Sequence, residues 1–415
     1  MKVLYLTTEF PWPATSGGMV RTASQLRTLA AVPDVREIAI LSVSETPVAG
    51  DRLEGLAAAV PKARVLPPVF HPIHLFDHLL YLPRVLVLRA LGIPYLAGKW
   101  DSPALRGVIA SELSSADTDV VYLDHLGMAR YLHALDAYRS KVRVVLEQHN
   151  VESDFFRKFA EAKSGWRGLI ARAEWRAAER FESAAMKSVD AVVAISSNDA
   201  DQFRKMAGVE AHVVPVVATI SRSERPRPDG PRFCYVGNLR WRPNAEGLTW
   251  FCQQVWPAIR RRMPDATFEI AGIGLPSNAQ GKPVVPDSWM VPGVETVGFL
   301  DDLEPLYARS VAVLAPVLGG SGVRIKLLES FSAGMPVVTT PDGAAGLPLS
   351  HDDQLLIASD PSSFAEQAER LARSEALRSR LTQSAFGFLA AEHSQEAAVA
   401  VMERALGLHK VSKHS

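Results

Sequence analysis

The sequence lacks any excess of charge of one sign. Its 415 residues include 45 Lys and Arg and 45 Asp and Glu, so the formal net charge is zero. Neither half of the chain forms a strongly basic segment. A protein that holds nucleic acid by neutralising phosphates needs a basic surface. The composition therefore argues against a nucleic-acid partner.

Cysteine and long apolar runs are also scarce. The two cysteines, Cys234 and Cys252, both lie inside apolar runs, which predicts buried thiols in a reducing compartment. No run reaches the roughly 18 apolar residues that a membrane-spanning helix needs. The first apolar run, Met1–Leu6, is too short for a signal peptide and is typical of a first β-strand. We expect a cytoplasmic protein.

Motifs for metals and dinucleotides are missing as well. No G-x-G-x-x-G follows the first expected strand, and no His/Cys/Asp cluster has the spacing of a metal site. Two Asp-x-Asp triplets occur, at 117–119 and 199–201. The first precedes a strand and so lies at the wrong end of a sheet, and the second is typical of a capped, acidic helix start. We therefore expect neither a metal nor a cofactor.

What the sequence does contain is an alternation of short β-branched runs with longer helical segments. This pattern predicts parallel sheets covered by helices, and the length favours two domains. The expected strands of the first half are Lys2–Leu6, Glu37–Val43, Ala63–Leu66, Val120–Leu123, Val142–Glu147, Ala191–Ile195 and His212–Val216. Those of the second half are Phe233–Val236, Thr267–Ala271, Glu295–Val297, Val311–Pro316, Pro336–Thr339 and Leu355–Ala358.

The predicted fold class is α/β, with two Rossmann-like domains whose parallel sheets face each other across a cleft. The first domain spans residues 1–220, and a charged, Pro-rich linker occupies 221–231. The second domain spans 232–395, and 396–415 form a C-terminal helix that can cross back to the first domain. Ligands of such sheets bind at the carboxyl ends of the strands.

The strongest local signal is a Gly-rich segment after the strand Val311–Pro316. Gly319, Gly320 and Gly322 leave the backbone free to approach a ligand, with Ser321 between the last two, and the following helix offers free N–H groups to phosphate. Arg324 and Lys326 can neutralise a diphosphate, and Glu329, about two turns on, can accept hydrogen bonds from ribose hydroxyls. The plainer alternative is a Gly-rich turn that leads into an amphipathic helix.

This segment resembles the donor-binding region of the family-4 glycosyltransferases, retaining enzymes of the GT-B fold. The resemblance is strongest from Tyr235 to Leu347 and includes the motifs at 235–244, 268–272 and 297–299. It is closest to bacterial exopolysaccharide and cell-surface glycan transferases. The resemblance implies that the second domain binds the nucleotide-sugar through Gly237, Arg240, Arg242, Gly320, Ser321, Gly322, Arg324, Lys326 and Glu329.

The sequence departs from the family pattern at two places. Ser321 stands where the family often has the first of two glutamates, eight residues before Glu329. Asn238 stands near a common Arg, and Asn244 near a common Lys. Arg240, Arg242 and Lys326 are the cations that can substitute for that basic pair.

In the first half, His125 and His149 each follow an expected strand, where ligands of parallel sheets bind. Gly17 and Gly18 follow the first strand and suit close approach of the backbone to a phosphate or sugar. The resemblance implies that both histidines contact the donor sugar or the acceptor in the cleft. Glu152, close after His149 in the sequence, is the residue that can orient it. The alternative is a structural role for each of these residues.

The segment from His71 to Leu96 is apolar, with Pro83 and Pro94 breaking it and Arg84 and Arg89 within it. One interpretation is a buried helix pair. The other is a surface that enters a membrane interface or holds a lipid acceptor, with both arginines and Lys99 near anionic headgroups.

These features predict a glycosyltransferase that moves a sugar from a UDP- or GDP-linked donor to a glycan or lipid-linked acceptor. The resemblance implies retention of configuration without a metal. The expected location is the cytoplasm, with peripheral contact to the inner face of the membrane. Two alternatives remain open, a nucleotide-sugar 2-epimerase and a non-catalytic protein of the same fold that binds a sugar nucleotide or a partner protein.

Overall fold

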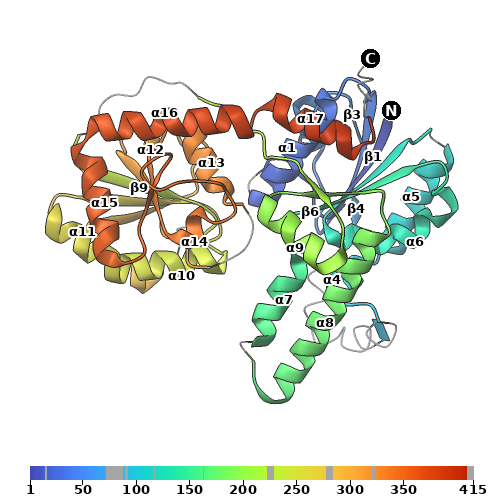
Figure 1. Ribbon diagram of the computed structural model, residues 1–415, viewed down its shortest axis with the longest axis horizontal. Coiled ribbons are helices and arrows are strands. Elements are labelled where there is room, and N and C mark those ends of the chain that lie inside the picture. The colour runs from blue at the N-terminus through green and yellow to red at the C-terminus, as the bar shows by residue number, and fades with distance from the viewer. Residues whose placement is uncertain are drawn as a thin grey trace. The chain divides into compact units, whose positions relative to one another are not determined.

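The computed structural model describes residues 1–14, 16–71, 87–88, 92–115, 117–161, 163–221, 229–276, 284–319 and 323–408. The chain divides into two compact units. Unit 1 consists of Met1–Val217 with Gln395–Ser415, and unit 2 consists of Ala218–Ser394. Each unit contains one parallel sheet with helices packed around it (Figure 1). The expectation of two parallel-sheet α/β domains is therefore confirmed.

The sheet of unit 1 has eight strands in the order β3-β2-β1-β5-β6-β7-β8, with β4 paired to β2. Their bounds are β1 (Lys2–Thr7), β2 (Glu37–Ser44), β3 (Ala63–Val65), β4 (Val69–Phe70), β5 (Val120–Asp124), β6 (Arg143–Gln148), β7 (Ala191–Ala194) and β8 (Ala211–Val213). The chain builds outward from β1 to β3 and then returns to the other side of β1 as β5. The strand order therefore reverses between β1 and β5, which is where open parallel sheets bind ligands.

Helices cover both faces of this sheet because alternate residues of β1 point to opposite sides. Leu4 and Leu6 belong to one apolar core, whereas Val3 and Tyr5 belong to the other. The helices are α1 (Gly17–Ala31), α2 (Gly50–Ala59), α4 (Tyr95–Gly98), α5 (Pro103–Ser115), α6 (Leu132–Leu135), α7 (Glu152–Glu161), α8 (Gly165–Lys187), α9 (Ser197–Ala207) and α17 (Gln395–Ala405), with 3-10 turns η3 (Leu126–Tyr131) and η4 (Asp136–Tyr138). The last helix, α17, packs beside α1 in the second core.

The sheet of unit 2 has six strands in the order β11-β10-β9-β12-β13-β14. They are β9 (Arg232–Val236), β10 (Thr267–Ala271), β11 (Val294–Gly298), β12 (Ala312–Ala315), β13 (Val337–Thr339) and β14 (Leu356–Ile357). The helices are α10 (Arg242–Trp250), α11 (Trp256–Arg262), α12 (Glu304–Ala308), α13 (Ile325–Ser332), α14 (Pro341–Ala344), α15 (Pro361–Arg373) and α16 (Glu375–Glu392), with a π-helical turn η5 (Phe251–Val255) and a 3-10 turn η6 (Asp287–Trp289). The order reverses between β9 and β12, so unit 2 repeats the topology of unit 1.

Most of the segment from His71 to Leu96, for which the sequence allows a membrane surface or a helix pair, lies outside the described residues. These include Pro83, Arg84, Leu86 and Arg89. Of the described residues in this segment, Leu88 and Leu96 are buried. Among the described residues, no helix is long and apolar enough to cross a membrane.

Candidate functional site

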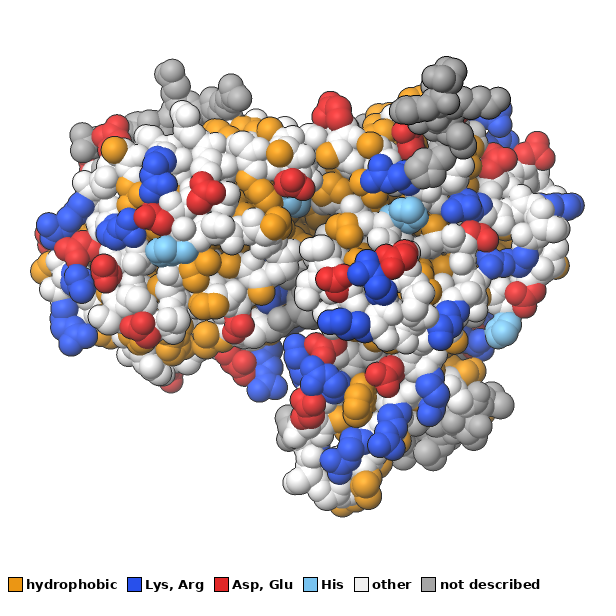
Figure 2. Space-filling view, in the orientation of Figure 1, with side chains coloured by type: hydrophobic (Ala, Val, Ile, Leu, Met, Phe, Trp, Pro, Cys, Tyr) orange, Lys and Arg blue, Asp and Glu red, His pale blue; other side chains and the backbone are white. Residues whose placement is uncertain are grey.

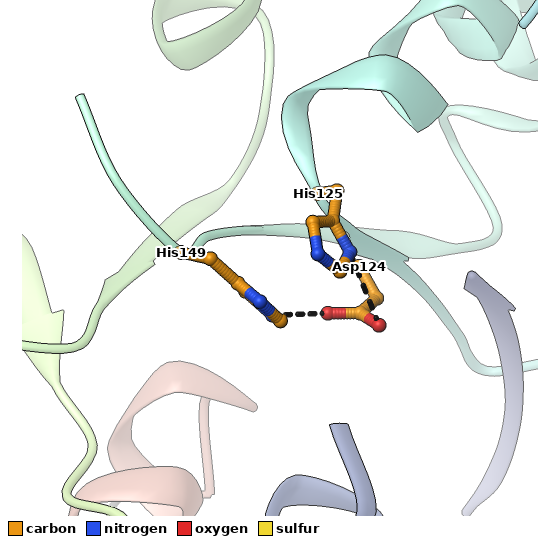
Figure 3. A group of neighbouring side chains, drawn as sticks. All are labelled: Asp124, His125 and His149. Carbon is orange, nitrogen blue, oxygen red and sulfur yellow. Dashed lines mark hydrogen bonds and ion pairs between the residues drawn. The ribbon is translucent and has the colours of Figure 1, made fainter. Parts of the chain in front are cut away.

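In unit 1, chemically active side chains gather where β5 and β6 end. Asp124 is the last residue of β5, His125 follows it directly, and His149 comes just after β6 (Figure 3). Because β5 and β6 are parallel neighbours, their carboxyl ends bring residues that are 25 positions apart into contact. His125 has a φ of 76°, which turns the chain sharply at the end of β5. The sequence-predicted histidines therefore share one site.

Asp124 holds both imidazoles. Its Oδ1 lies 2.7 Å from Nε2 of His149, and its Oδ2 lies 3.4 Å from Nδ1 of His125. Thr22 on α1 donates a hydrogen bond of 2.8 Å to Oδ2. The two imidazole rings lie against each other, with centroids 3.6 Å apart. Figure 3 shows both rings turned toward the same carboxylate.

The charges of these groups follow from their surroundings. Burial would raise the pKa of Asp124, but the charges of His125 and His149 and their hydrogen bonds hold it well below its usual value. Burial, followed by the charge of His125, lowers the pKa of His149. Burial also opposes charge on His125, but Asp124, Glu9 and Glu152 outweigh it and raise the pKa to about 9. At neutral pH, Asp124 is ionised, neutral His149 donates its Nε2–H to Asp124, and His125 is a cation.

Asp124, His125 and His149 also have potential metal-ligand atoms within 4.8 Å of one another, and no other such group occurs among the described residues. Spacing along the sequence did not reveal this group. The 2.7 Å contact between Asp124 and His149 is that of a hydrogen bond, so the arrangement is satisfied as a carboxylate–imidazole pair. The Asp-x-Asp triplets have structural contacts, since Asp119 accepts from the backbone of Lys2 and Asp199 lies in the first turn of α9, capped by Ser196.

A buried ion pair lies in the same part of unit 1. Arg21 of α1 donates to Glu147 of β6 at 2.7 Å, and both side chains are fully buried. Glu147 also accepts hydrogen bonds from Gln25 and Tyr122, and Arg21 donates to the backbone oxygen of Val214. The network ties α1 to the sheet. Sequence reasoning missed it, although a charged residue inside the apolar strand at 143–148 signals a buried partner.

Three acidic side chains lie in this part of unit 1. Glu9 and Glu152 act on His125 through their charges, and Glu182 accepts hydrogen bonds from the start of α7. Glu9 follows β1, and its Oε1 lies so near Gly18 that a Cβ there would approach it to 3.2 Å. Glu152 begins α7, and its backbone N–H donates to the carboxylate of Glu182. Burial raises the pKa of both Glu9 and Glu152, while the charge of His125 opposes the rise. Gly17 begins α1, which Ser16 caps by accepting from the N–H of Met19.

In unit 2, the corresponding position at the ends of β9 and β12 holds a cation. Lys326 on α13 donates to the hydroxyl of Tyr235 at 2.8 Å and to Oδ1 of Asn244 at 2.6 Å. Gly237 follows β9, and a Cβ there would approach Nζ of Lys326 to 3.2 Å. Burial, helped by the charge of Arg324, lowers the pKa of Lys326 to about 7. Asn244, at the place of the family's common Lys, therefore helps to position a different cation.

Arg324 stands directly before α13. The side chain is buried and donates to the backbone oxygens of Gly319 and Asp342. The N–H of Gly319, which has a φ of 74°, donates to the carboxylate of Asp342 at 2.8 Å. Sequence reasoning missed Asp342. Gly320, Ser321 and Gly322 lie outside the described residues.

The remaining predicted donor residues are Glu329, Arg240 and Arg242. Glu329 lies on α13, where burial of its carboxyl group raises the pKa to about 7 and the charge of Lys326 opposes the rise. Arg240 is exposed, and its N–H donates to Asn238. Arg242 pairs with Glu246, and its side chain is 86% exposed. The structure thus places Gly237 and Lys326 together and leaves Arg242 directed to solvent.

Comparison with known families covers both units. Residues 70–220 match the model described as Glycosyltransferase Family 4, and residues 230–374 match the model described as Glycosyl transferases group 1. The chain belongs to glycosyltransferase family 4. The sequence resemblance is therefore confirmed.

A relative of this family-4 glycosyltransferase occurs in Klebsiella pneumoniae, where it is described as an uncharacterized 44.6 kDa protein in the cps region. It is 25% identical over 259 residues, which span 61% of this chain and 65% of the relative. The match thus covers less than two thirds of the relative's length.

Solved structures share the fold over almost the whole chain. HepE from Anabaena, in complex with UDP, superposes with a TM-score of 0.66 at 14% identity and covers 99% of this chain and 100% of its own. TarM from S. aureus, in a complex that includes UDP, gives a TM-score of 0.69 at 9% identity, with 98% and 100% covered. At such low identity these structures establish the fold of the family-4 glycosyltransferase and nothing finer.

Proposed function

We propose that this family-4 glycosyltransferase moves a sugar from a UDP- or GDP-linked donor to a hydroxyl of a glycan or lipid-linked acceptor. We further propose that transfer retains the anomeric configuration and needs no metal ion. The observation that carries the proposal is the group of Lys326, Tyr235 and Asn244 where the strand order of unit 2 reverses. This group offers a fixed cation at the position where open parallel sheets bind nucleotides.

Unit 2 is proposed to bind the leaving nucleotide diphosphate. Departure of the diphosphate leaves negative charge on its terminal oxygen, and a preorganised cation stabilises that charge as it develops. Lys326 is already oriented by two hydrogen bonds, so little reorganisation is needed. Its pKa of about 7 rises when an anion binds nearby, so the bound diphosphate holds it in the charged form. Arg324 donates to the backbone oxygens of Gly319 and Asp342, which lie in the same part of unit 2.

Unit 1 is proposed to bind the transferred sugar and the acceptor. The His125 imidazolium can donate to a sugar or acceptor oxygen, while Asp124 holds it in place. His149 is fixed by Asp124 through Nε2, which leaves Nδ1 as its acceptor nitrogen. In a retaining reaction the acceptor attacks from the face that the diphosphate leaves. Positioning of that hydroxyl then supplies much of the rate enhancement.

The metal-free part of the proposal rests on the same charges. A divalent ion in a transferase neutralises the diphosphate, and Lys326 with the N–H groups near the start of α13 can take over that task. The proposed location remains the cytoplasm, with peripheral contact to the inner face of the membrane.

A product assay with a labelled donor tests the function. We expect transfer of label to an acceptor at a rate unaffected by chelator, with the donor's configuration kept in the product. Isomerised donor without transfer would instead identify an epimerase. Nucleotide-sugar binding without either product would identify a non-catalytic binding protein.

A further inference from the structure

Helices α7 and α8 form a hairpin that extends away from the sheet of unit 1 (Figure 1). We call residues 152–187 the hairpin. Helices α7 and α8 pack against each other, and Ser153 and Ala160 of α7 are buried. The N–H groups that begin α7 are held by Glu182 of α8. The hairpin is therefore an ordered element with its own inner contacts.

The outer faces of the hairpin carry large apolar side chains that the unit does not cover. Eleven large hydrophobic side chains are exposed among the described residues, and five of them lie on the hairpin. On α7, Phe155 and Phe159 are 66% and 50% exposed. On α8, Trp166, Leu169 and Ile170 are 67%, 65% and 62% exposed. The spacings of three and four residues place each set on one side of its helix, so the exposure is a patterned surface rather than scattered residues.

Cations stand beside these apolar residues. Lys163 lies over the ring of Phe159 at 5.3 Å, and Arg167 lies over the ring of Trp166 at 5.2 Å. Between residues 154 and 172 the sequence has five Lys or Arg and two acidic residues, Asp154 and Glu161. These two acids pair with Arg157 and Lys158, and the other cations are Lys163, Arg167 and Arg172. Figure 2 shows Lys and Arg side chains next to hydrophobic ones over this hairpin. The end of the hairpin thus combines exposed aromatic rings with positive charge.

We propose that the end of the hairpin, residues 155–172, docks on the surface of an anionic lipid bilayer. Aromatic and aliphatic side chains enter the boundary between headgroups and acyl chains, where Trp is favoured, and Lys and Arg contact anionic headgroups. Long cationic side chains that lie over aromatic rings can keep their charged ends at headgroup level. A second copy of the chain fits this surface less well, because two identical surfaces bring their positive charges together.

This docking surface is separate from the site at Asp124, His125 and His149 and does not depend on transfer. It also differs from the segment between His71 and Leu96, for which the sequence allows either a buried helix pair or a membrane surface. Five exposed apolar side chains and their neighbouring cations carry the proposal by themselves.

Sedimentation of the full chain with vesicles tests the proposal. We expect binding to vesicles that contain phosphatidylglycerol and phosphatidylcholine, and at least tenfold weaker binding to phosphatidylcholine alone. The double variant Trp166→Ser, Leu169→Ser should bind these vesicles at least tenfold more weakly. The double variant Lys163→Gln, Arg167→Gln should bind vesicles with and without anionic lipid equally. Met290→Ser is the matched control, because Met290 is 62% exposed on unit 2. It should bind like the parent.

Folding and self-association are followed in the same variants. All four hairpin residues to be changed are surface residues, so circular dichroism and thermal unfolding should match the parent. Failure of the parent to bind anionic vesicles, equal binding to neutral ones, or equal loss with Met290→Ser would overturn the proposal. A parent dimer in ultracentrifugation that dissociates in the Trp166→Ser, Leu169→Ser variant, without vesicle binding, would assign the surface to a second copy instead. Transfer to a water-soluble acceptor, measured without vesicles, reports on the enzyme independently.

Discussion

The two units place different chemistry at the same point of the same topology. In each sheet the strand order reverses beside the first strand of the unit, at β1 and β5 in unit 1 and at β9 and β12 in unit 2. Unit 1 puts carboxylates and imidazoles there, held in a buried network. Unit 2 puts Lys326 there, held by a phenol and an amide. The fold decides where a ligand binds, and the side chains decide which part of the ligand binds there.

The two units also differ in the contacts that hold the side chains of each site in place. In unit 1 the supporting contacts are buried and involve carboxylates: Arg21 forms an ion pair with Glu147, and neutral His149 donates a hydrogen bond to Asp124. In unit 2 the groups that position Lys326 are neutral hydrogen-bond acceptors, so a change there should affect ligand binding more than folding.

The largest effect is expected from Glu147→Gln. The change leaves the buried guanidinium of Arg21 without its carboxylate partner, which should lower the free energy of unfolding of unit 1 by about 3–5 kcal/mol. Hydrogen exchange should show faster opening of β6 and α1 and unchanged protection of β9 and β12. Glu210→Gln is the matched control, because Glu210 pairs with Arg204 on the surface, where solvent screening leaves the pair little effect on stability. Equal stability of the two variants would contradict the account.

His125→Gln is expected to lower the rate of transfer on the order of 10²–10³-fold, since it removes one positioned cationic donor. The dissociation constant of UDP should stay within about twofold. Because the pKa of His125 is raised to about 9, the charged form is present at neutral pH and transfer should fall as the pH rises through 9. His133→Gln serves as control, since His133 is 89% exposed on α6. A variant with parental transfer would show that His125 has only a structural role.

Lys326→Met should weaken binding of UDP or GDP by about 1.5–3 kcal/mol, or roughly ten- to a hundredfold. The unfolding free energy should change less than in Glu147→Gln, because Met can occupy the same partly buried space. Arg261→Met, an exposed change in the same unit, should bind nucleotide normally. Calorimetric titration with UDP or GDP measures the nucleotide affinity of both variants. Unchanged affinity for Lys326→Met would remove the phosphate role.

The pH dependence of nucleotide affinity also tests the role of the Lys326 charge. Lys326 has a lowered pKa of about 7 and loses its charge above that pH, so nucleotide affinity should fall as the pH rises from 7, by at most about tenfold per unit. Glu329 acts in the opposite direction, since it becomes a carboxylate as the pH rises through its raised pKa of about 7. Glu329→Gln should therefore steepen the fall, and Lys326→Met should abolish it.

Glu329→Gln is expected to have the smallest effect, about tenfold on nucleotide affinity, through a weaker hydrogen bond to ribose. Inorganic pyrophosphate has no ribose, so its binding should not change, whereas Lys326→Met should weaken both ligands. A variant that unfolds more easily yet binds UDP like the parent would make Glu329 a structural residue.

Much of the fold could be predicted because it depends on local pattern. Strands such as 2–7 and 120–124 are short, apolar and bounded by turns, and the structure places them close to the expected bounds. Short edge strands were harder, since β4 was not expected and β8 is Ala211–Val213 rather than His212–Val216. Two or three residues carry too little periodicity to fix a strand.

The site was predictable where position along a strand was sufficient. His125 and His149 follow parallel strands, so the strand ends alone placed them in one region. Asp124, Glu147 and Arg21 were missed because their roles depend on pairing across 25 to 126 residues, which no spacing rule contains. The contact of Lys326 with Tyr235 and Asn244 was missed for the same reason.

The central proposal is that unit 2 binds the nucleotide and unit 1 acts on the sugar and the acceptor. It is tested most directly by measuring UDP affinity and sugar transfer together in His125→Gln and Lys326→Met. The account predicts that His125→Gln keeps parental UDP affinity and loses transfer, while Lys326→Met loses UDP affinity roughly ten- to a hundredfold. Loss of UDP affinity in His125→Gln as large as that in Lys326→Met would contradict it.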